Sequence, residues 1–380
     1  MSPPSLRILM TADAVGGVWV YATALARGLA ARGHRVTLVT LGPRPQAAQM
    51  RDVEDVAGLD VVTTDLALEW MDPAGADFSR ACRRLTALER RVAPDIVHLN
   101  GFREASATWN APVLLVAHSC VWSWWRACRG CDPSEPCWST YAANVRAGLA
   151  AAQRWVAPST AFRDEVAALY APARAGKVIA NGLTIARRRV MKQPIILAAG
   201  RLWDEAKNIA PLAAAAPRLA WRLRIAGPLA GGTAGASGRR LAREVSWLGP
   251  LPRHELLAEM RHAAIFAAPA VYEPFGLTVL EAASAGCALV LADIPTFREL
   301  WEGAALFVDP RDETLLAATL EWVAGDERLR RTLQRRASVR ARRYSLDRMC
   351  EAYCTLYGQM MGVRPAAPIA RRRMQIEARA

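Results

Sequence analysis

Short apolar runs alternate with amphipathic helical patterns along almost the whole chain of 380 residues. Strands that alternate with helices in this way are typical of a parallel α/β sheet. In the first half, the runs that predict strands are residues 6–10, 35–41, 60–63, 95–99, 113–117, 155–157 and 177–180. In the second half they are residues 194–199, 221–226, 245–248, 264–268, 288–291 and 305–308. Helical patterns lie between the runs, for example Val18–Arg32 and Asp312–Ala324.

The two halves repeat an architecture and not a sequence, which predicts two α/β domains that each have a parallel sheet. With 52% hydrophobic residues, the chain is long enough to bury two ordinary cores. The turn signal Asn181-Gly182 separates the halves. We therefore place the connection near residues 182–193, the first domain at residues 1–182 and the second at residues 183–344.

The last part of the chain predicts one more helix, Ser345–Met361, within a segment that we bound at residues 345–363. Residues 364–380 contain Arg371-Arg372-Arg373 and broken periodicity. Such a basic terminus predicts a disordered tail or one that touches a membrane surface.

The most informative segment joins a strand to a helix. The apolar run 264–268 is followed by an acidic turn, Glu273-Pro274-Phe275-Gly276, and then by an apolar helix that starts at Leu277 and carries Glu281. A helix N-terminus has unpaired N–H groups that suit a phosphate, and Gly276 allows close approach to the backbone. The two acids can accept hydrogen bonds from hydroxyls on either side of a diphosphate. This arrangement predicts a site for a nucleotide-sugar.

A second candidate site follows the strand at residues 194–199. Gly200 and Arg201 come directly after it, and Lys207 comes six residues after the arginine. Ligands of open α/β sheets bind at the carboxyl ends of the strands, so both cations are expected to face the diphosphate. Cations are needed there because cleavage of the sugar–phosphate bond leaves negative charge on the departing nucleotide. The sequence has no Asp-x-Asp pair of the kind that holds Mg²⁺ or Mn²⁺ in metal-dependent sugar-nucleotide enzymes, which favours a reaction without a metal.

Glu273-x7-Glu281, with Phe275-Gly276-Leu277 after the first acid and Ala-Ala-Ser-Ala-Gly after the second, resembles the signature of the retaining glycosyltransferase family 4. This family has the GT-B fold of two Rossmann-like domains, in which the last helix crosses back to the N-terminal domain. The resemblance implies that Glu273 contacts the hydroxyls of the donor sugar and Glu281 those of the ribose. It also implies that the backbone of Phe275, Gly276 and Leu277 lines the sugar and the diphosphate.

The resemblance extends to other loops. It implies that Gly16 and Gly17, after the first strand, touch the donor across the cleft, and that His118, after residues 113–117, contacts the donor sugar. The Gly-Arg-Leu…Lys loop is also similar, although Lys207 comes one residue later than in the family pattern. The tryptophans that follow His118 lie where the family diverges, and we expect them in a loop that forms the acceptor wall; they are Trp122, Trp124 and Trp125.

Composition limits the other partners. The net charge is +14, but only Lys177, Lys192 and Lys207 of the 49 basic residues are lysines, so a coding bias toward arginine explains the charge better than a nucleic-acid site. The charge also favours contact with anionic donors or an anionic membrane face. No apolar run reaches the about 18–20 residues of a membrane span, and we expect a cytoplasmic protein. The nucleotide-sugar would be a substrate, and no cofactor is expected.

The cysteines leave one alternative open. Cys128-x2-Cys131-x5-Cys137, with Cys120 nearby, is compatible with a small zinc site, but scattered free thiols explain the eight cysteines better. Three further functions also remain open. They are an epimerase of the same fold acting on nucleotide-sugars, a protein that binds sugar nucleotides without turnover, and a pyridoxal-phosphate phosphorylase. The favoured hypothesis is transfer of a sugar to a saccharide, lipid-linked or small-molecule acceptor.

Overall fold

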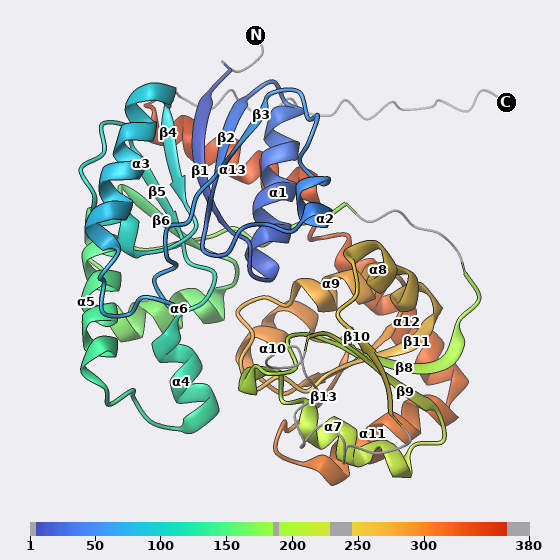
Figure 1. The fold of residues 1–380 in the computed structure, drawn as a ribbon. Coiled ribbons are helices and arrows are strands. Elements are labelled where there is room, and N and C mark those ends of the chain that lie inside the picture. Colours follow the sequence, from blue (N-terminus) through green and yellow to red (C-terminus); the bar gives the residue numbers. More distant parts are fainter. Residues whose placement is uncertain (1–4, 185–189, 229–244, 363–380) are drawn as a thin grey trace, which may run out of the picture.

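The computed structural model describes residues 5–184, 190–228 and 245–362, and it contains two α/β domains that each have a parallel sheet (Figure 1). The predicted basic tail, residues 364–380, and Arg187-Arg188-Arg189 lie outside the described residues. Two Rossmann-like parallel sheets confirm the fold class expected from the sequence.

The N-terminal sheet has seven strands in the order β3-β2-β1-β4-β5-β6-β7. The strands are β1 (Arg7–Asp13), β2 (Arg35–Leu41), β3 (Leu59–Thr63), β4 (Ile96–Leu99), β5 (Val113–Val116), β6 (Arg154–Ala157) and β7 (Lys177–Val178). The helices are α1 (Gly17–Ala30), α2 (Ala47–Met50), α3 (Phe78–Val92), α4 (Val121–Arg129), α5 (Pro136–Ala151) and α6 (Thr160–Tyr170), with a 3₁₀ turn η1 (Arg103–Ser106). Strands β1, β4 and β5 are buried almost throughout, because helices cover both faces of the sheet.

The C-terminal sheet has six strands in the order β10-β9-β8-β11-β12-β13. The strands are β8 (Gln193–Ala199), β9 (Arg222–Ala226), β10 (Val245–Gly249), β11 (Ala263–Ala268), β12 (Ala288–Ala292) and β13 (Leu306–Val308). The helices are α7 (Ile209–Ala215), α8 (Arg253–His262), α9 (Leu277–Ser284), α10 (Pro295–Trp301), α11 (Glu313–Gly325) and α12 (Glu327–Ala341), with 3₁₀ turns η2 (Glu205–Lys207) and η3 (Ala216–Arg218). Strand β8 starts this sheet at its centre and β11 pairs beside it, so the loops after both strands open at one edge.

The last helix, α13 (Leu346–Met360), returns to the N-terminal domain and packs against α1, as Figure 1 shows. Its apolar stripe, which includes Met349, Tyr353 and Tyr357, is buried in the core beneath the N-terminal sheet. This arrangement confirms the expected crossover helix.

One local prediction is wrong. Trp122, Trp124 and Trp125, expected in a loop, lie on the helix α4 (Val121–Arg129). The helix begins after the extended Cys120 and ends at Gly130, whose left-handed conformation (φ 71°) closes the last turn. The tryptophans give the helix an apolar face, and Ser123 lies fully buried on it. Packing of this face therefore outweighs the turn-forming residues that suggested a loop.

The two domains touch along α4 and α6 on the N-terminal side. The buried Tyr272 hydroxyl, in the loop after β11, accepts a hydrogen bond from Cys120 N at 3.1 Å and lies 2.8 Å from Ser123 Oγ. Ser159 Oγ donates to the carbonyl oxygen of Pro274 at 2.8 Å. These bonds attach the loop that carries Glu273 directly to the opposite domain.

A carboxylate from one domain also caps a helix of the other. Both carboxylate oxygens of Glu299, on α10, accept backbone N–H groups of Thr160 and Ala161 at the start of α6, each at 2.8 Å. The first N–H groups of a helix have no partner within the helix and favour negative charge. This bond is therefore made only when the two domains are together.

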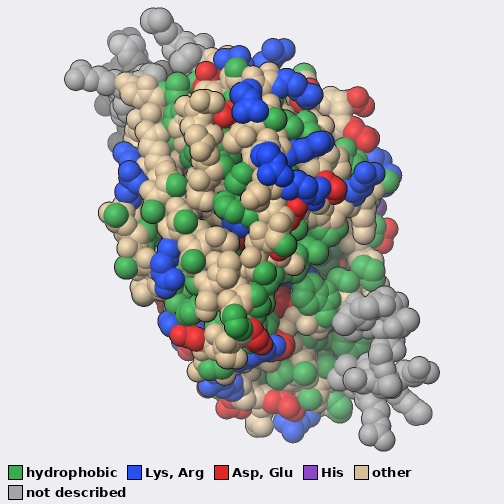
Figure 2. Space-filling view, turned by 60° about the vertical axis from the view of Figure 1, so that its left-hand side comes forward, with side chains coloured by type: hydrophobic (Ala, Val, Ile, Leu, Met, Phe, Trp, Pro, Cys, Tyr) green, Lys and Arg blue, Asp and Glu red, His purple; other side chains and the backbone are tan. Residues whose placement is uncertain are grey.

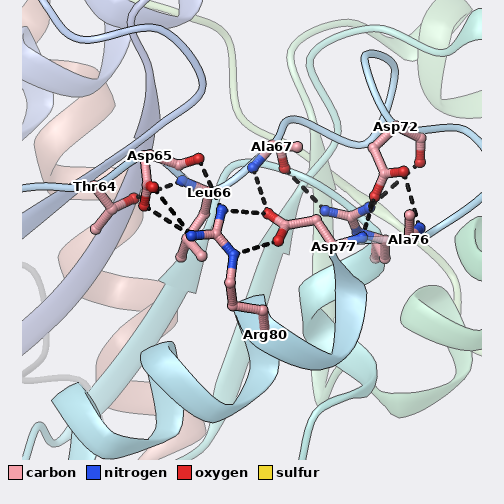
Figure 3. A network of polar contacts seen from close by, with 9 residues as sticks. Thr64, Asp65, Leu66, Ala67, Asp72, Ala76, Asp77 and Arg80 are labelled. Carbon is pink, nitrogen blue, oxygen red and sulfur yellow. Dashed lines mark hydrogen bonds and ion pairs between the residues drawn. The ribbon is translucent and has the colours of Figure 1, made fainter.

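The loop between β3 and α3, residues 64–77, is tied at both ends (Figure 3). Arg80 lies on α3, and its Nη1 is 3.0 Å from Asp65 Oδ2. Nη1 of the buried Arg103 is 2.8 Å from Asp72 Oδ2. Arg103 also donates to the carbonyl oxygen of Ala67 at 2.9 Å. These bonds hold the middle of the loop against the carboxyl end of β4.

The surface carries both signs of charge. Figure 2 shows Lys and Arg side chains at several places on one face of the molecule, with acidic side chains between them. Among the helices of the described residues, none combines the length and apolar character that a membrane-spanning segment requires. The expected contact with a membrane surface stays a prediction.

Candidate functional site

A cavity of about 710 Å³ is lined by residues of both domains and lies at the carboxyl ends of strands from both sheets. The structure brings nearly all of the predicted site residues to it. They are Gly16, Gly17, His118, Trp124, Trp125, Gly200, Arg201, Lys207, Glu273, Phe275, Gly276, Leu277 and Glu281. Trp122 is the exception: it packs into the N-terminal core, and its Nε1 donates to the carbonyl oxygen of Trp138 at 3.2 Å.

The turn before α9 presents a helix N-terminus to the cavity. Gly276 has φ 84°, in the left-handed region, and a Cβ there would lie only 3.0 Å from the ring of Phe297. Both facts restrict this position to glycine. Glu273 Oε1 accepts the Gly276 N–H at 3.0 Å and so closes the turn. The backbone that follows, at Leu277 and Thr278, lines the cavity.

Lys207 binds the same carboxylate from the neighbouring strand. Its Nζ donates to Glu273 Oε2 at 2.6 Å, and the two side chains are 20% and 17% exposed. The shift of one residue relative to the family spacing is accommodated by η2, which turns the lysine back toward the cavity. The pair therefore presents one cation and one acid on the same wall.

Arg201 is held by an acid that sequence reasoning missed. Its Nη2 donates to Asp204 Oδ2 at 2.8 Å, while Asp204 Oδ1 accepts from Trp124 Nε1 at 2.9 Å across the domain boundary. Burial opposes ionisation of Asp204, but the bonds from Arg201 and Trp124 outweigh it and hold the pKa of this carboxyl below its ordinary value. Asp204 therefore stays charged and fixes the direction of Arg201.

Arg201 also faces the first glycine loop. Gly16 has φ 91°, and a Cβ at this position would lie 2.6 Å from Arg201 Nη1. A side chain at residue 16 would be strained and would collide with the guanidinium. Gly17 lies close to Leu277 of the C-terminal domain, since a Cβ added at Gly17 would lie 3.7 Å from Leu277 Cδ1. The N-terminal domain thus places backbone without a side chain directly against Arg201.

Glu281 lies deeper, on α9, with its side chain 5% exposed. Its Oε1 accepts from Arg253 Nε at 2.8 Å. Burial raises the pKa of Glu281, and the arginine opposes that rise. Arg253, at the start of α8, carries no motif that would have identified it from the sequence.

His118 is the end of a hydrogen-bonded chain. Asn100 Nδ2 donates to the carbonyl oxygen of Thr11 at 2.6 Å, so Asn100 Oδ1 faces His118 Nε2 at 2.9 Å and must accept its proton. Burial lowers the pKa of His118 to about 3, and the ring is neutral at physiological pH. Its Nδ1 therefore carries a lone pair that can accept a hydrogen bond.

The series of hydrogen bonds that ends at His118 continues into the crossover helix α13. His98 Nε2 lies 3.3 Å from both Asn100 Oδ1 and the Tyr21 hydroxyl. Tyr21 in turn donates to the Tyr353 hydroxyl at 2.7 Å, and the Tyr357 hydroxyl lies 2.6 Å from His98 Nδ1. One tautomer satisfies every bond: His98 donates from Nε2 and accepts the Tyr357 proton at Nδ1. Two tyrosines of α13 thus fix the histidines of the N-terminal sheet.

Aromatic rings form the N-terminal wall of the cavity. The ring centroids of Trp125 and Trp138 lie 5.9 Å apart, and the Arg129 guanidinium lies 4.2 Å from the centroid of the Trp125 ring. Arg129 is also paired with Glu205 of the C-terminal domain at 2.9 Å. Trp138, which the prediction did not include, lines the cavity together with Trp124 and Trp125.

The cysteine cluster was the alternative metal site. All four of these cysteines are free thiols; they are Cys120, Cys128, Cys131 and Cys137. Within the described parts of the chain, no three His, Cys, Asp or Glu side chains are grouped so that they could hold a metal ion.

Known families match both halves of the chain. Residues 15–187 match Glycosyltransferase Family 4, and residues 185–340 match Glycosyl transferases group 1. The chain is 30% identical over 394 residues to the glycogen synthase of Mycobacterium tuberculosis, which covers 90% of this chain and 91% of that protein.

Solved structures share the fold. Sucrose-phosphate synthase from Thermosynechococcus elongatus is similar with a TM-score of 0.75 at 19% identity, over 94% of this chain and 99% of that chain. HepE of Anabaena in complex with UDP and glucose gives a TM-score of 0.71 at 16% identity, over 93% and 100% of the two chains. Together with the full-length relative and the Glu273–Glu281 motif at the cavity, these matches establish that the chain belongs to glycosyltransferase family 4 and has the GT-B fold.

Proposed function

We propose that this glycosyltransferase moves a hexose from a nucleoside-diphosphate sugar to a hydroxyl of a saccharide, lipid-linked or small-molecule acceptor, with retention of configuration and without a metal ion. The observation that carries the proposal is the convergence of Arg201 and Lys207 beside the N-terminus of α9, in a cavity closed from the other side by Gly16. HepE, of the same fold, was solved with UDP and glucose, which supports a donor of this class.

The leaving group would be stabilised by fixed positive charge. When the bond from the anomeric carbon to the diphosphate breaks, negative charge grows on the phosphate oxygens beside Arg201, Lys207 and the N–H groups of α9. Donors already held in place cost little reorganisation at that moment. Asp204 and Glu273 keep the two cations aimed at this spot before any donor binds.

The remaining groups would orient the sugar and the nucleotide. Glu273 and the His118 Nδ1 lone pair accept hydrogen bonds from sugar hydroxyls, and Glu281 accepts from the ribose. The acceptor oxygen forms its bond to the anomeric carbon on the face that the diphosphate leaves. Its proton passes to the departing phosphate oxygen, so the step balances without a protein nucleophile. Trp124, Trp125 and Trp138 would stack against acceptor rings.

A panel of UDP-, GDP- and ADP-sugars, tested by thermal shift, examines the donor class directly. Specific binding raises Tm by mass action, and one nucleotide should stand out. NMR of the product from that donor then reports the anomeric configuration, and a chelator should leave the rate unchanged. Absence of binding at millimolar concentration, an inverted product, or activity that needs added Mn²⁺ would refute the corresponding part of the proposal.

The same NMR experiment separates the competing functions. An epimerase would convert the donor in the absence of any acceptor, and a silent binding protein would show a thermal shift without turnover. A transferase should consume the donor rapidly only when an acceptor is present, because the closed cavity limits access of water.

The bonds behind His118 give a prediction of their own. Tyr357→Phe removes the proton donor to His98 Nδ1, which frees His98 to change tautomer and weakens the orientation of Asn100 and His118. We expect kcat to fall by about threefold to tenfold, the loss that corresponds to one buried hydrogen bond. The ¹⁵N shifts of the His98 ring should change, and the KM of the donor should move less than kcat.

Tyr344→Phe is the matched control, because the Tyr344 hydroxyl donates to the carbonyl oxygen of Leu300 and takes no part in this chain of bonds. A Tyr357→Phe protein with unchanged imidazole shifts, or a Tyr344→Phe protein with the same loss of kcat, would show that the bonds do not position His118.

A further inference from the structure

A small recess extends the cavity into the N-terminal domain. It has a volume of about 50 Å³, and six of its lining residues also line the main cavity: Asp13, Val18, Glu69, Trp70, His118 and Ser119. A water molecule occupies about 30 Å³, so the recess has room for one or two hydroxyl groups and not for a sugar ring. A ring whose edge reached into the recess would itself lie in the main cavity, beside the tryptophans.

Two carboxylate oxygens meet in this recess around Gly101. A Cβ at Gly101 would lie 3.8 Å from Glu69 Oε1 and 3.7 Å from Glu104 Oε2. Neither oxygen accepts a hydrogen bond from the described residues, although Glu104 is only 3% exposed. Neither oxygen is enclosed by protein: both residues line the recess, so a hydroxyl of a ligand that enters it can donate a hydrogen bond to each.

The other oxygen of each of these carboxylates already accepts hydrogen bonds within the protein. Glu69 Oε2 accepts the backbone N–H groups of Phe102 at 3.1 Å and Arg103 at 2.9 Å, and Glu104 Oε1 accepts Arg103 Nε at 2.9 Å. The loop that carries Glu69 is tied by Arg80 to Asp65 (Figure 3). It is also tied by Arg103 to Asp72. The two free oxygens therefore stand in fixed positions before any ligand arrives.

Acidic residues line the recess, and one of them, Glu104, is paired with Arg103 behind the wall. Asp13, Glu69 and Glu104 line it, and of the described residues at its wall none is a lysine or an arginine. Burial and the charge of Glu104 raise the pKa of Glu69 to about 7, and burial raises the pKa of Asp13 to about 6. Arg129, on the N-terminal wall of the main cavity, is engaged by Glu205 and Trp125.

We infer that this recess selects the acceptor: it takes two hydroxyls of an uncharged sugar or cyclitol ring through Glu69 Oε1 and Glu104 Oε2, and it excludes acceptors that carry a phosphate on that edge. The inference rests on the proposed function, since it assigns the acceptor of the same site. Hydroxyls donate to carboxylates, whereas a phosphate offers only acceptor oxygens and like charge.

Matched pairs of probes test the inference on the unaltered protein. Binding of glucose and glucose 6-phosphate, and of myo-inositol and inositol 1-phosphate, is measured by saturation-transfer NMR with the enzyme loaded with UDP. The same pairs are then compared as acceptors of label from the best donor. We expect the neutral member of each pair to be favoured by about tenfold or more, because the fields of nearby like charges are strong in a partly buried site.

Glu69→Gln tests directly whether one of the two carboxylates binds the acceptor. The glutamine carbonyl can still accept the N–H groups of Phe102 and Arg103, but the recess then presents an amide donor in place of a carboxylate oxygen. We expect the KM of the neutral acceptor to rise by about tenfold, as for loss of a hydrogen bond to a charged group. The preference for the neutral probe over the phosphorylated probe should become smaller, while the affinity for UDP stays unchanged.

Glu89→Gln is the matched control, because Glu89 Oε1 accepts the backbone N–H groups of Asn110 and Ala111 in the same manner but lies away from the cavity. It should leave the acceptor KM unaltered. The inference is wrong if a phosphorylated probe binds as well as its neutral partner, if no neutral probe binds the UDP-loaded enzyme, or if Glu69→Gln changes no more than Glu89→Gln. Failure of any nucleotide-sugar to bind would instead refute the proposed function, which the thermal-shift panel measures separately.

Discussion

Replacement of Lys207 by methionine should lower kcat by about 10²–10³-fold, the usual cost of removing one donor aimed at charge that develops in the transition state. Methionine keeps the length of the side chain and its packing on Gly200, where a Cβ would lie 3.2 Å from Lys207 Cγ. Only the cation is lost. The KM of the donor should rise less than kcat falls, because the charge on the leaving phosphate is larger in the transition state than in the bound donor.

Steady-state kinetics with the best donor of the panel measure this effect, and thermal unfolding measures the stability of the variant. Arg224→Met is a matched control: Arg224 pairs with Glu259 at 2.7 Å, the two side chains are 24% and 26% exposed, and neither lines the cavity. The control should lose stability to a similar extent and keep its activity. Equal losses of kcat in the two variants would assign Lys207 a structural role.

Strand and helix positions could be predicted from the sequence because they depend on local periodicity. Buried parallel strands such as β11 leave a continuous apolar run, and α13 shows the repeating apolar stripe of a helix that packs on one side. Helix α4 was missed because the turn-forming residues among its tryptophans suggested a loop. Its apolar face is stabilised by contacts with α5 and with the other domain, which the local sequence does not encode.

The loops that follow β8 and β11 could also be predicted, since their motifs fix both the turn and the chemistry. The partners of those motif residues could not. Asp204 follows Arg201 by only three residues, but no pattern marks it as the partner of that arginine. Arg253 is a single charged residue that only the fold brings to Glu281. Tyr357 lies 259 residues from His98, and its hydroxyl reaches that ring only because α13 crosses back.

The bonds between the two domains could not be predicted from the sequence either. Tyr272 and Glu299 look like an ordinary core aromatic and a surface acid in the sequence, yet they join the two domains. Tyr272 directly precedes Glu273, so this interdomain bond and the position of Glu273 depend on the same short segment. The functional motif is therefore recognisable in the sequence, while the contacts that hold it closed require the structure.

Glu273→Gln should also lower kcat by about 10²–10³-fold, since it removes a charge that orients a catalytic cation and contacts the sugar. The glutamine carbonyl can still accept the Gly276 N–H that closes the turn before α9, so the turn should survive and Tm should fall by only a few degrees. What is lost is the acceptor for Lys207 Nζ, now 2.6 Å from Glu273 Oε2. The position of the lysine and the hydrogen bonds to the sugar hydroxyls should change together.

A double-mutant cycle separates these two effects. If the main task of Glu273 is to orient Lys207, then Glu273→Gln in a Lys207→Met background should cost little more than Lys207→Met alone, and the free energies should be far from additive. If Glu273 acts on the sugar independently, the two losses should multiply. Glu259→Gln, which breaks the comparable pair with Arg224 outside the cavity, should leave kcat unchanged. A Glu273→Gln protein that retained full turnover would remove this residue from the catalytic site, whatever its effect on Tm.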